Sequence, residues 1–148
     1  MRTIIAGSRT ITSRDVIQKA VEASGIEITE IVSGKARGVD TLGEDWARMN
    51  NIPVAGFPVT PADWKRYGKR AGYLRNRKMG EYAEALIAVW DGKSRGTGHM
   101  IAIADELGLV VKAFIFDEKT GELKEYDGSP KDGSALPSPA LAKPGIGP

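Results

Sequence analysis

The sequence predicts an α/β fold: a doubly wound, parallel sheet of about five strands with helices on both faces. Short apolar stretches, as expected of strands buried on both faces, alternate with longer segments that carry a helical spacing of apolar residues. Glycine-rich or polar loops follow these apolar stretches. The chain of 148 residues is 41% hydrophobic and 27% charged, which suits one globular domain with a real core.

The first half of the chain is predicted to contain three strands and two helices. The strands are runs of mostly apolar, β-branched residues. A helix over Asp15–Ala23 is expected to be capped by Thr12 or Ser13, because hydroxyl groups accept the free N–H groups of a first turn. A second helix is expected over Thr41–Asn50. The strands are Thr3–Ala6, Ile28–Val32 and Val54–Val59.

The second half is predicted to add two helices, two strands and a short hairpin strand at the sheet edge. From Gly128 to Pro148 the chain carries five of its eight prolines and few large apolar residues. We therefore expect a disordered, flexible tail after a domain of residues 1–127. The helices are Tyr73–Ala83 and Met100–Leu107, the strands are Ala85–Trp90 and Leu109–Phe116, and the hairpin strand is Leu123–Tyr126.

A glycine-rich loop is expected between Trp90 and the helix that begins at Met100. Glycines let a backbone approach a ligand closely, and N–H groups at a helix start attract anions. The loop therefore predicts a phosphate site, although an ordinary strand–helix turn has the same composition. Its glycines are Gly92, Gly96 and Gly98, with further donors in Ser94, Arg95 and Thr97.

Four strand-to-helix loops are expected to meet at one edge of the sheet. Right-handed crossovers place these loops together, and open α/β sheets bind ligands at this edge, where the strand order reverses. Their convergence predicts a binding site more firmly than any single loop. The loops are Gly7–Arg9, Ser33–Asp40, Trp64–Arg75 and Trp90–Thr97.

The segment from Lys65 to Lys78 holds seven basic residues and no acidic one. Trp64, Tyr67 and Tyr73 are interleaved with these cations. Such a run is often a solvated face, but aromatic rings can stack a base while arginines meet phosphate. We therefore expect a ligand wall here, with Trp64 and Tyr67 as stacking residues and Arg70, Arg75 and Asn76 as contacts.

Taken together, the loops resemble the YspA/YpsA-related branch of the SLOG superfamily, over about residues 1–116. The superfamily is Rossmann-like and includes the Lonely Guy phosphoribohydrolases and the DNA-processing protein DprA. The resemblance implies a nucleotide or nucleotide-derived ligand, such as an ADP-ribose-like or NAD-like compound. The matching motifs are Gly7-Ser8-Arg9, Ser33-Gly34-x-Ala36-Arg37-Gly38-Val39-Asp40, Tyr67-Gly68-Lys69-Arg70-Ala71-Gly72, Arg75-Asn76 and Trp90-Asp91-Gly92-Lys93-Ser94-Arg95-Gly96-Thr97.

One departure from the superfamily bears on catalysis. Lonely Guy enzymes carry P-G-G-x-G-T-x-x-E with a catalytic glutamate, and Met100 stands at that position here. Cleaving an N-glycosidic bond builds positive charge on the sugar, which a carboxylate stabilises. Asp40 and Asp91 are the carboxylates expected at the site. His99 is a candidate general acid or base, because the ordinary pKa of histidine suits that role near neutral pH. We therefore expect a sensor or sequestering module that binds the nucleotide ligand. The alternative function is a nucleotide-processing hydrolase, and the second alternative is DNA binding like that of DprA.

Single residues leave alternatives open. Asp40 is a candidate for ribose hydroxyls or for capping its helix, whereas Asp91 has no evident capping role. Arg37 is either an anion contact or a surface arginine. The catalytic candidates are Asp91, Asp40 and His99. The ligand-binding candidates are Gly7, Ser8, Arg9, Ser33, Gly34, Arg37, Gly38, Asp40, Trp64, Tyr67, Arg70, Arg75, Asn76, Asp91, Ser94, Gly96, Thr97 and Gly98.

Composition narrows the remaining classes. The absence of cysteine excludes disulfides and zinc–sulfur sites, and a single histidine excludes a multi-histidine metal site. We expect no metal and no required cofactor, only the nucleotide ligand. The sequence has no apolar run long enough to span a membrane, and its N-terminal apolar stretch is too short for a signal peptide. We therefore expect a cytoplasmic protein without a membrane partner. A net charge of +2 makes nucleic acid the less favoured partner, and a homo-oligomer stays open.

Overall fold

In the computed structural model, residues 1–126 are described. Asp127 and the predicted tail Gly128–Pro148 lie outside these residues. Across residues 1–126, no helix combines the length and apolar character needed to cross a membrane.

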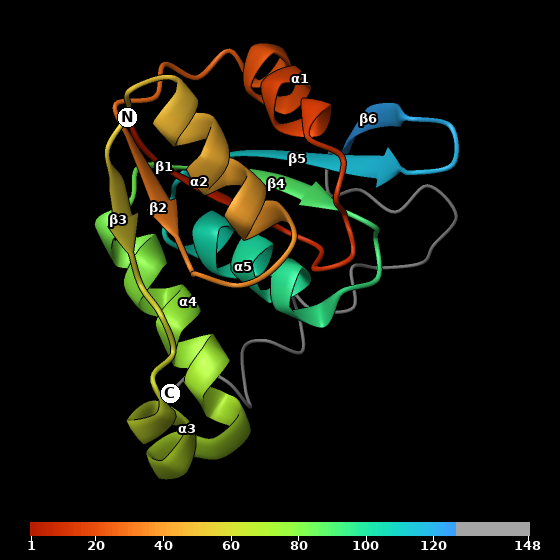
Figure 1. Cartoon of the computed structure of the whole chain (residues 1–148). Helices are drawn as coiled ribbons and strands as arrows, with labels where there is room; N and C mark the ends of the chain where they lie inside the picture. Colours follow the sequence, from red (N-terminus) through yellow and green to blue (C-terminus); the bar gives the residue numbers. More distant parts are fainter. Residues whose placement is uncertain (127–148) are drawn as a thin grey trace.

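The sheet confirms the predicted fold class (Figure 1). Its six strands run in the order β3-β2-β1-β4-β5-β6. The pairs from β3 to β5 are parallel, and β6 returns antiparallel to β5 as the expected edge hairpin. The strand order reverses between β1 and β4, the position where such sheets bind ligands. The strands are β1 Arg2–Gly7, β2 Glu30–Ser33, β3 Val54–Gly56, β4 Ala85–Trp90, β5 Val110–Asp117 and β6 Glu122–Tyr126.

Alternating side chains divide the core between the two faces of the sheet. Ile5 and Ile87 pack with apolar residues of α1 and α2, whereas Ile4 and Leu86 pack with those of α4 and α5. The two helix pairs therefore cover opposite faces (Figure 1). The helices are α1 Asp15–Ser24, α2 Val39–Met49, α4 Ala71–Tyr82 and α5 Arg95–Glu106.

Several element ends differ from the predicted ones. The cap expected at Thr12 or Ser13 is wrong, because α1 starts after Arg14, which makes no side-chain capping bond. At its other end α1 closes on Gly25 in the left-handed conformation, which glycine adopts readily. The third strand is three residues long and ends at Gly56.

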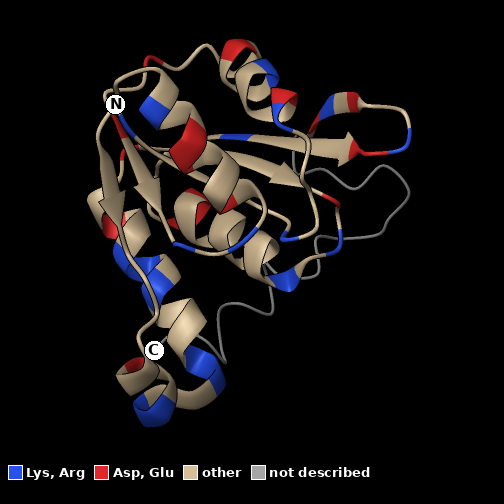
Figure 2. Cartoon of the chain, in the orientation of Figure 1, with Lys and Arg blue, Asp and Glu red and all other residues tan. Residues whose placement is uncertain are grey.

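An unpredicted short helix follows β3. This helix, α3 (Pro61–Tyr67), continues through a 3₁₀ turn, η1 (Gly68–Arg70), into α4. Thr60 accepts the N–H of Asp63, and the Asp63 carboxylate accepts the N–H of Thr60, so a capping box fixes the helix start. Neither α3 nor η1 contains a buried residue. Figure 2 shows Lys and Arg gathered on α3, η1 and α4.

Two glycines let neighbouring loops approach at the centre of the sheet. A Cβ atom on Gly7 would lie 1.9 Å from the carbonyl oxygen of Val89. Gly38 has a φ of +73°, and a Cβ atom there would lie 2.4 Å from the carbonyl oxygen of Ser8. Both positions therefore require glycine, so that the first residues of α2 can rest against the β1–α1 loop.

We expect Gly38→Ala to lower the free energy of unfolding by roughly 3 kcal/mol, because the methyl group adds a backbone clash to an unfavourable φ. Gly108→Ala is the matched control, since Gly108 has a φ of +78° and a Cβ atom there would meet no atom within 4 Å. Its expected cost is about 1 kcal/mol. Chemical denaturation of both variants measures the difference, and equal losses would contradict the close approach of the two loops.

Candidate functional site

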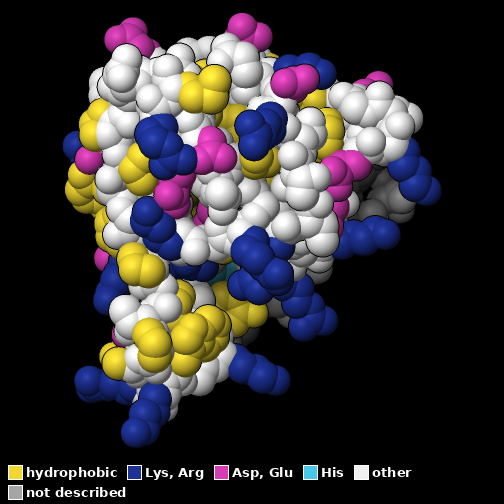
Figure 3. Space-filling model, in the orientation of Figure 1, with side chains coloured by type: hydrophobic (Ala, Val, Ile, Leu, Met, Phe, Trp, Pro, Cys, Tyr) yellow, Lys and Arg dark blue, Asp and Glu magenta, His cyan; other side chains and the backbone are white. Residues whose placement is uncertain are grey.

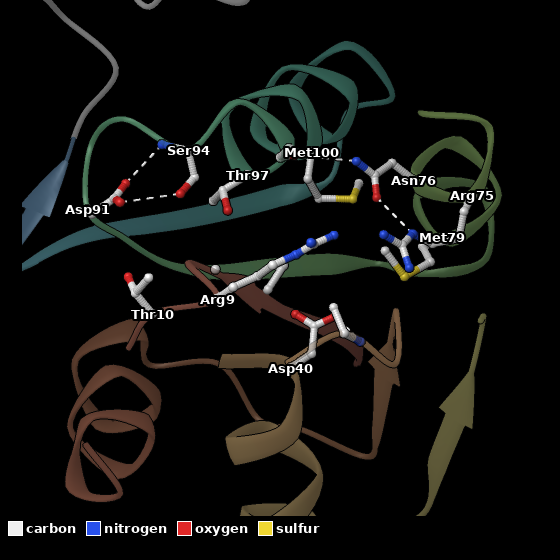
Figure 4. Close-up of a pocket in the computed structure, with 14 residues that line it drawn as sticks. Arg9, Thr10, Asp40, Arg75, Asn76, Met79, Asp91, Ser94, Thr97 and Met100 are labelled. Carbon is white, nitrogen blue, oxygen red and sulfur yellow. Dashed lines mark hydrogen bonds between the residues drawn. The ribbon is translucent and has the colours of Figure 1, made fainter. Parts of the chain in front are cut away.

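A cavity of about 240 Å³ lies where the strand order reverses (Figure 4). The β1–α1 loop, the start of α2, α4 and the N-terminal turn of α5 surround it. All four loops that the sequence indicates thus contribute lining residues, and the segment Trp64–Arg75 contributes only its last residue, Arg75. The lining residues are Ala6, Gly7, Arg9, Thr10, Ala36, Asp40, Arg75, Asn76, Met79, Asp91, Ser94, Gly96, Thr97 and Met100.

The glycine-rich segment is helical, which corrects the predicted loop. Helix α5 begins at Arg95, so Gly96, Thr97 and Gly98 lie in its first turn. The N–H of Gly98 already donates to the carbonyl of Ser94, at 3.1 Å. The first three N–H groups of a helix have no partner inside it, so those of Arg95, Gly96 and Thr97 are the donors at this end.

Asp91 organises the turn before α5, whose N-cap residue is Ser94. Its carboxylate accepts the N–H groups of Lys93 and Ser94, at 2.8 and 2.9 Å. Partial burial raises the pKa of Asp91, but these N–H bonds, with the hydroxyl groups of Ser8 and Ser94, leave it below its ordinary value. Asp91 is therefore an ionised carboxylate that is already engaged by its own turn.

Asp40 has the opposite environment. It is the second residue of α2 rather than its cap, and its carboxylate accepts the N–H of Ala36 at 3.3 Å, in the preceding loop. Burial raises its pKa to about 6, although the Ala36 bond and the charge of Arg75 oppose this shift. A carboxyl group that titrates near neutral pH beside a cavity can accept ligand hydroxyl groups or transfer a proton.

Arg75 and Asn76 connect α4 to the other walls of the cavity. The Arg75 guanidinium donates to the carbonyl oxygen of Gly34 at 2.5 Å and to the Asn76 side-chain oxygen at 3.1 Å. The Asn76 amide group donates to the carbonyl oxygen of Gly96 at 3.4 Å and faces Nδ1 of His99 at 3.1 Å. Burial lowers the pKa of Arg75, Asp40 partly restores it, and Arg9 lowers it again.

His99 lies behind the cavity rather than in it. Its side chain is buried against Tyr73, with ring centroids 4.5 Å apart. Burial lowers the pKa of His99 to about 4, so the ring is neutral near pH 7. Because Asn76 donates to Nδ1, the ring hydrogen belongs on Nε2, which has no partner among residues 1–126. In this position His99 orients Asn76.

The structure brings half of the candidate ligand-binding residues to the cavity. Gly7, Arg9, Asp40, Arg75, Asn76, Asp91, Ser94, Gly96 and Thr97 line it. Ser8, Ser33, Gly34 and Gly38 lie behind them as supports, through bonds within and between loops. Arg37 is exposed, and Gly98 is buried in α5. Trp64, Tyr67 and Arg70 lie outside this cavity, on α3 and η1.

Five lining residues are missing from the candidate ligand-binding residues. Thr10 falls one residue beyond the predicted loop, and Ala36 belongs to a matching motif but has a side chain too small to indicate a role. Ala6 and Met79 have the pattern of ordinary core residues, and Met100 is noted only as the residue that replaces a catalytic glutamate. In residues 1–126, no three His, Asp or Glu side chains are grouped closely enough to hold a metal ion.

The strand order and the position of the cavity define a Rossmann-like α/β protein. Residues 1–67 match the model of the YspA, cpYpsA-related SLOG family. Over 122 residues the chain is 35% identical to the Gene 61 protein of Mycobacterium phage D29, and the match covers 76% of this chain and 95% of the phage protein. The chain belongs to the YspA, cpYpsA-related SLOG family, as its loops predict.

The fold is also that of DNA processing protein A (DprA) from Streptococcus pneumoniae, known from an X-ray structure. The two structures align with a TM-score of 0.61 and 23% sequence identity, covering 76% of this chain. The chain spans about half the length of DprA, since the match covers 49% of that chain. This likeness establishes the Rossmann-like fold.

The raised pKa of Asp40 predicts a pH-dependent stability. The pKa of Asp40 rises from 3.8 in the unfolded chain to about 6 in the folded protein. Such a group stabilises the folded protein fully at pH values below 3.8, and this contribution is lost as the pH rises through about 6. Asp40→Asn removes the buried charge, so its stability relative to the original chain should increase by about 2 kcal/mol between pH 4 and pH 7.5. Denaturation at both pH values measures this difference. A difference that stays constant would contradict a buried, titrating Asp40.

Proposed function

We propose that the chain binds a phosphorylated, nucleotide-derived ligand in this cavity, as a sensor or sequestering module. The observation that carries the proposal is the convergence of two guanidinium groups on a cavity at a helix N-terminus. Arg9 and Arg75 both line the cavity, next to Gly96 and Thr97 of α5 (Figure 4). Membership of the SLOG family supports a nucleotide-related role.

Like charges in a small cavity favour an anion between them. Arg9 lowers the pKa of Arg75, which means that the two cations repel each other in the absence of a ligand. A phosphate group would relieve this repulsion through charge-assisted hydrogen bonds. The N–H groups at the start of α5 would add further donors, together with the positive end of the helix dipole.

The wall of the cavity formed by α2, across from the start of α5, suits a sugar. Asp40 faces the cavity from α2, and its pKa of about 6 leaves it mostly ionised at pH 7. An ionised carboxylate accepts hydrogen bonds from ribose hydroxyl groups, as acidic residues do in other dinucleotide-binding α/β proteins. A ribose phosphate unit therefore matches the chemistry of both walls.

Hydrolysis is the second candidate, and Asp40 is the observation that favours it. A carboxyl group with a pKa near 6 can act as a general acid or base at neutral pH. Incubation with AMP, NAD and ADP-ribose, followed by chromatography, separates the two functions. Binding without products supports the sensor. Product formation that Asp40→Asn abolishes would establish the hydrolase instead.

The helix start is tested by Gly96→Val. A Cβ atom on Gly96 meets no protein atom within 4 Å, so the variant should fold normally while its side chain fills the phosphate position. We expect loss of measurable ribose 5-phosphate and ADP-ribose binding in calorimetry. Gly72→Val is the matched control, because Gly72 is also the second residue of a helix, has equally open space and does not line the cavity. Normal binding by Gly96→Val would place the ligand elsewhere.

Thr97→Val tests one hydroxyl group at nearly constant shape. Thr97 lines the cavity and is buried there. Loss of one hydrogen bond to phosphate should weaken ligand affinity about tenfold, the equivalent of about 1.4 kcal/mol. Calorimetry with ADP-ribose gives the affinity, and circular dichroism checks the fold. Unchanged affinity would remove Thr97 from the site.

A further inference from the structure

A second, larger cavity lies beside the first and shares one wall with it. Its volume is about 650 Å³, and it runs between the segment after β3, helix α3 and the outer side of α4. We call it the α3–α4 groove. Arg75 lines both the groove and the first cavity. The lining residues are Gly56, Phe57, Pro58, Thr60, Asp63, Tyr67, Arg70, Ala71, Leu74, Arg75, Arg77, Lys78 and Glu81.

The first cavity is small for a whole nucleotide. Sites that bury a ligand of drug size span roughly 300–1,000 Å³, whereas this cavity holds about 240 Å³. A ribose phosphate unit is compatible with that space, and any larger ligand must extend beyond it. The shared Arg75 makes the α3–α4 groove the adjacent space into which it can extend.

The groove has more cations than carboxylates in its lining. Arg70 and Lys78 form no ion pair within residues 1–126, whereas Arg77 pairs with both Glu81 and Glu106. Asp63, one of the two carboxylates in the lining, is held by the capping box of α3, and its bonds with Thr60 together with the charge of Lys78 lower its pKa. Four cations and two carboxylates line the groove, so its net charge is positive, which suits a phosphate group.

The groove also has an aromatic wall on a helix with little tertiary support. Tyr67 is 41% exposed at the end of α3, and Phe57 lies in the lining as well. Since α3 contains no buried residue, it gains little from packing in the free protein. The space-filling view shows hydrophobic side chains ringed by Lys and Arg over the part of the molecule that α3 forms (Figure 3). A planar base against Tyr67 would cover this surface.

We propose that the α3–α4 groove binds the nucleoside phosphate half of a two-part ligand, whose ribose phosphate half occupies the first cavity. Arg75 meets the linkage between the halves, Arg70 and Lys78 meet the second phosphate, and Tyr67 stacks the base. The ligand class is thus a ribose joined through a pyrophosphate to a nucleoside, as in ADP-ribose. This inference rests on the proposed phosphate site at α5.

Calorimetry with two probes tests the proposal. Ribose 5-phosphate fills only the first cavity, and ADP-ribose extends into the groove. We expect Arg70→Ala to weaken ADP-ribose binding at least about tenfold and to leave ribose 5-phosphate binding unchanged. Lys69→Ala is the matched control, since Lys69 is the exposed neighbour of Arg70 in η1 and does not line the groove. It should leave the affinity for both probes unchanged.

The base is tested at Tyr67. Tyr67→Ala should weaken ADP-ribose binding about tenfold, whereas Tyr67→Phe keeps the ring and should bind as the original chain does. Equal affinity of the original chain for ribose 5-phosphate and ADP-ribose would contradict ligand binding in the groove, but not the phosphate site at α5. Equal losses of ADP-ribose affinity in Arg70→Ala and Lys69→Ala would do the same. Binding of neither probe by the original chain would overturn the proposed function together with this inference.

Discussion

The candidate site depends on the backbone and hydroxyl group of Ser8, at the end of β1. Its N–H donates to the carbonyl oxygen of Val89, and its own carbonyl oxygen accepts the N–H groups of Ile11 and Val39. Its hydroxyl oxygen accepts the N–H of Asp91 at 2.9 Å. One buried residue thus fixes the β1–α1 loop, the start of α2 and the turn before α5 in relation to one another. The cavity is the space that these three segments leave at the reversal of strand order.

Burial and charge give the two walls of this cavity different chemistry. The wall formed by α4 and α5 has the guanidinium group of Arg75 and the first N–H groups of α5, whereas the α2 wall carries Asp40 with a pKa raised to about 6. Asn76 and the neutral His99 hold α4 against the first turn of α5, so the cation on α4 and the donors on α5 keep a fixed spacing. This arrangement favours a ligand with an anionic end and a hydroxyl-bearing end.

The sequence predicts the parallel sheet and the edge at which its strand-to-helix loops converge, because these follow from apolar patterning and crossover handedness. The sequence pattern places the starts of several helices at the wrong residues. Three closely spaced glycines lower helix propensity, so the predicted helix begins at Met100. In the structure α5 begins at Arg95, where Gly98 donates to the carbonyl oxygen of Ser94 and Asn76 donates to that of Gly96. Asp91 accepts the N–H group of Ser94, the N-cap residue of α5, and Asp40 lies inside α2, so the surroundings of both carboxylates follow from helix starts that the sequence pattern misplaces.

The first N–H groups of α5 are the proposed phosphate donors, and amide NMR measures their contact with phosphate directly. Titrating the ¹⁵N-labelled chain with ribose 5-phosphate should shift the amide signals of Arg95, Gly96 and Thr97 most, together with the side-chain signals of Arg75. The amide signals of α3 and η1 should move little, because this probe does not reach the groove. Largest shifts on the lysine- and arginine-rich α3 and η1, with none at the start of α5, would contradict the account.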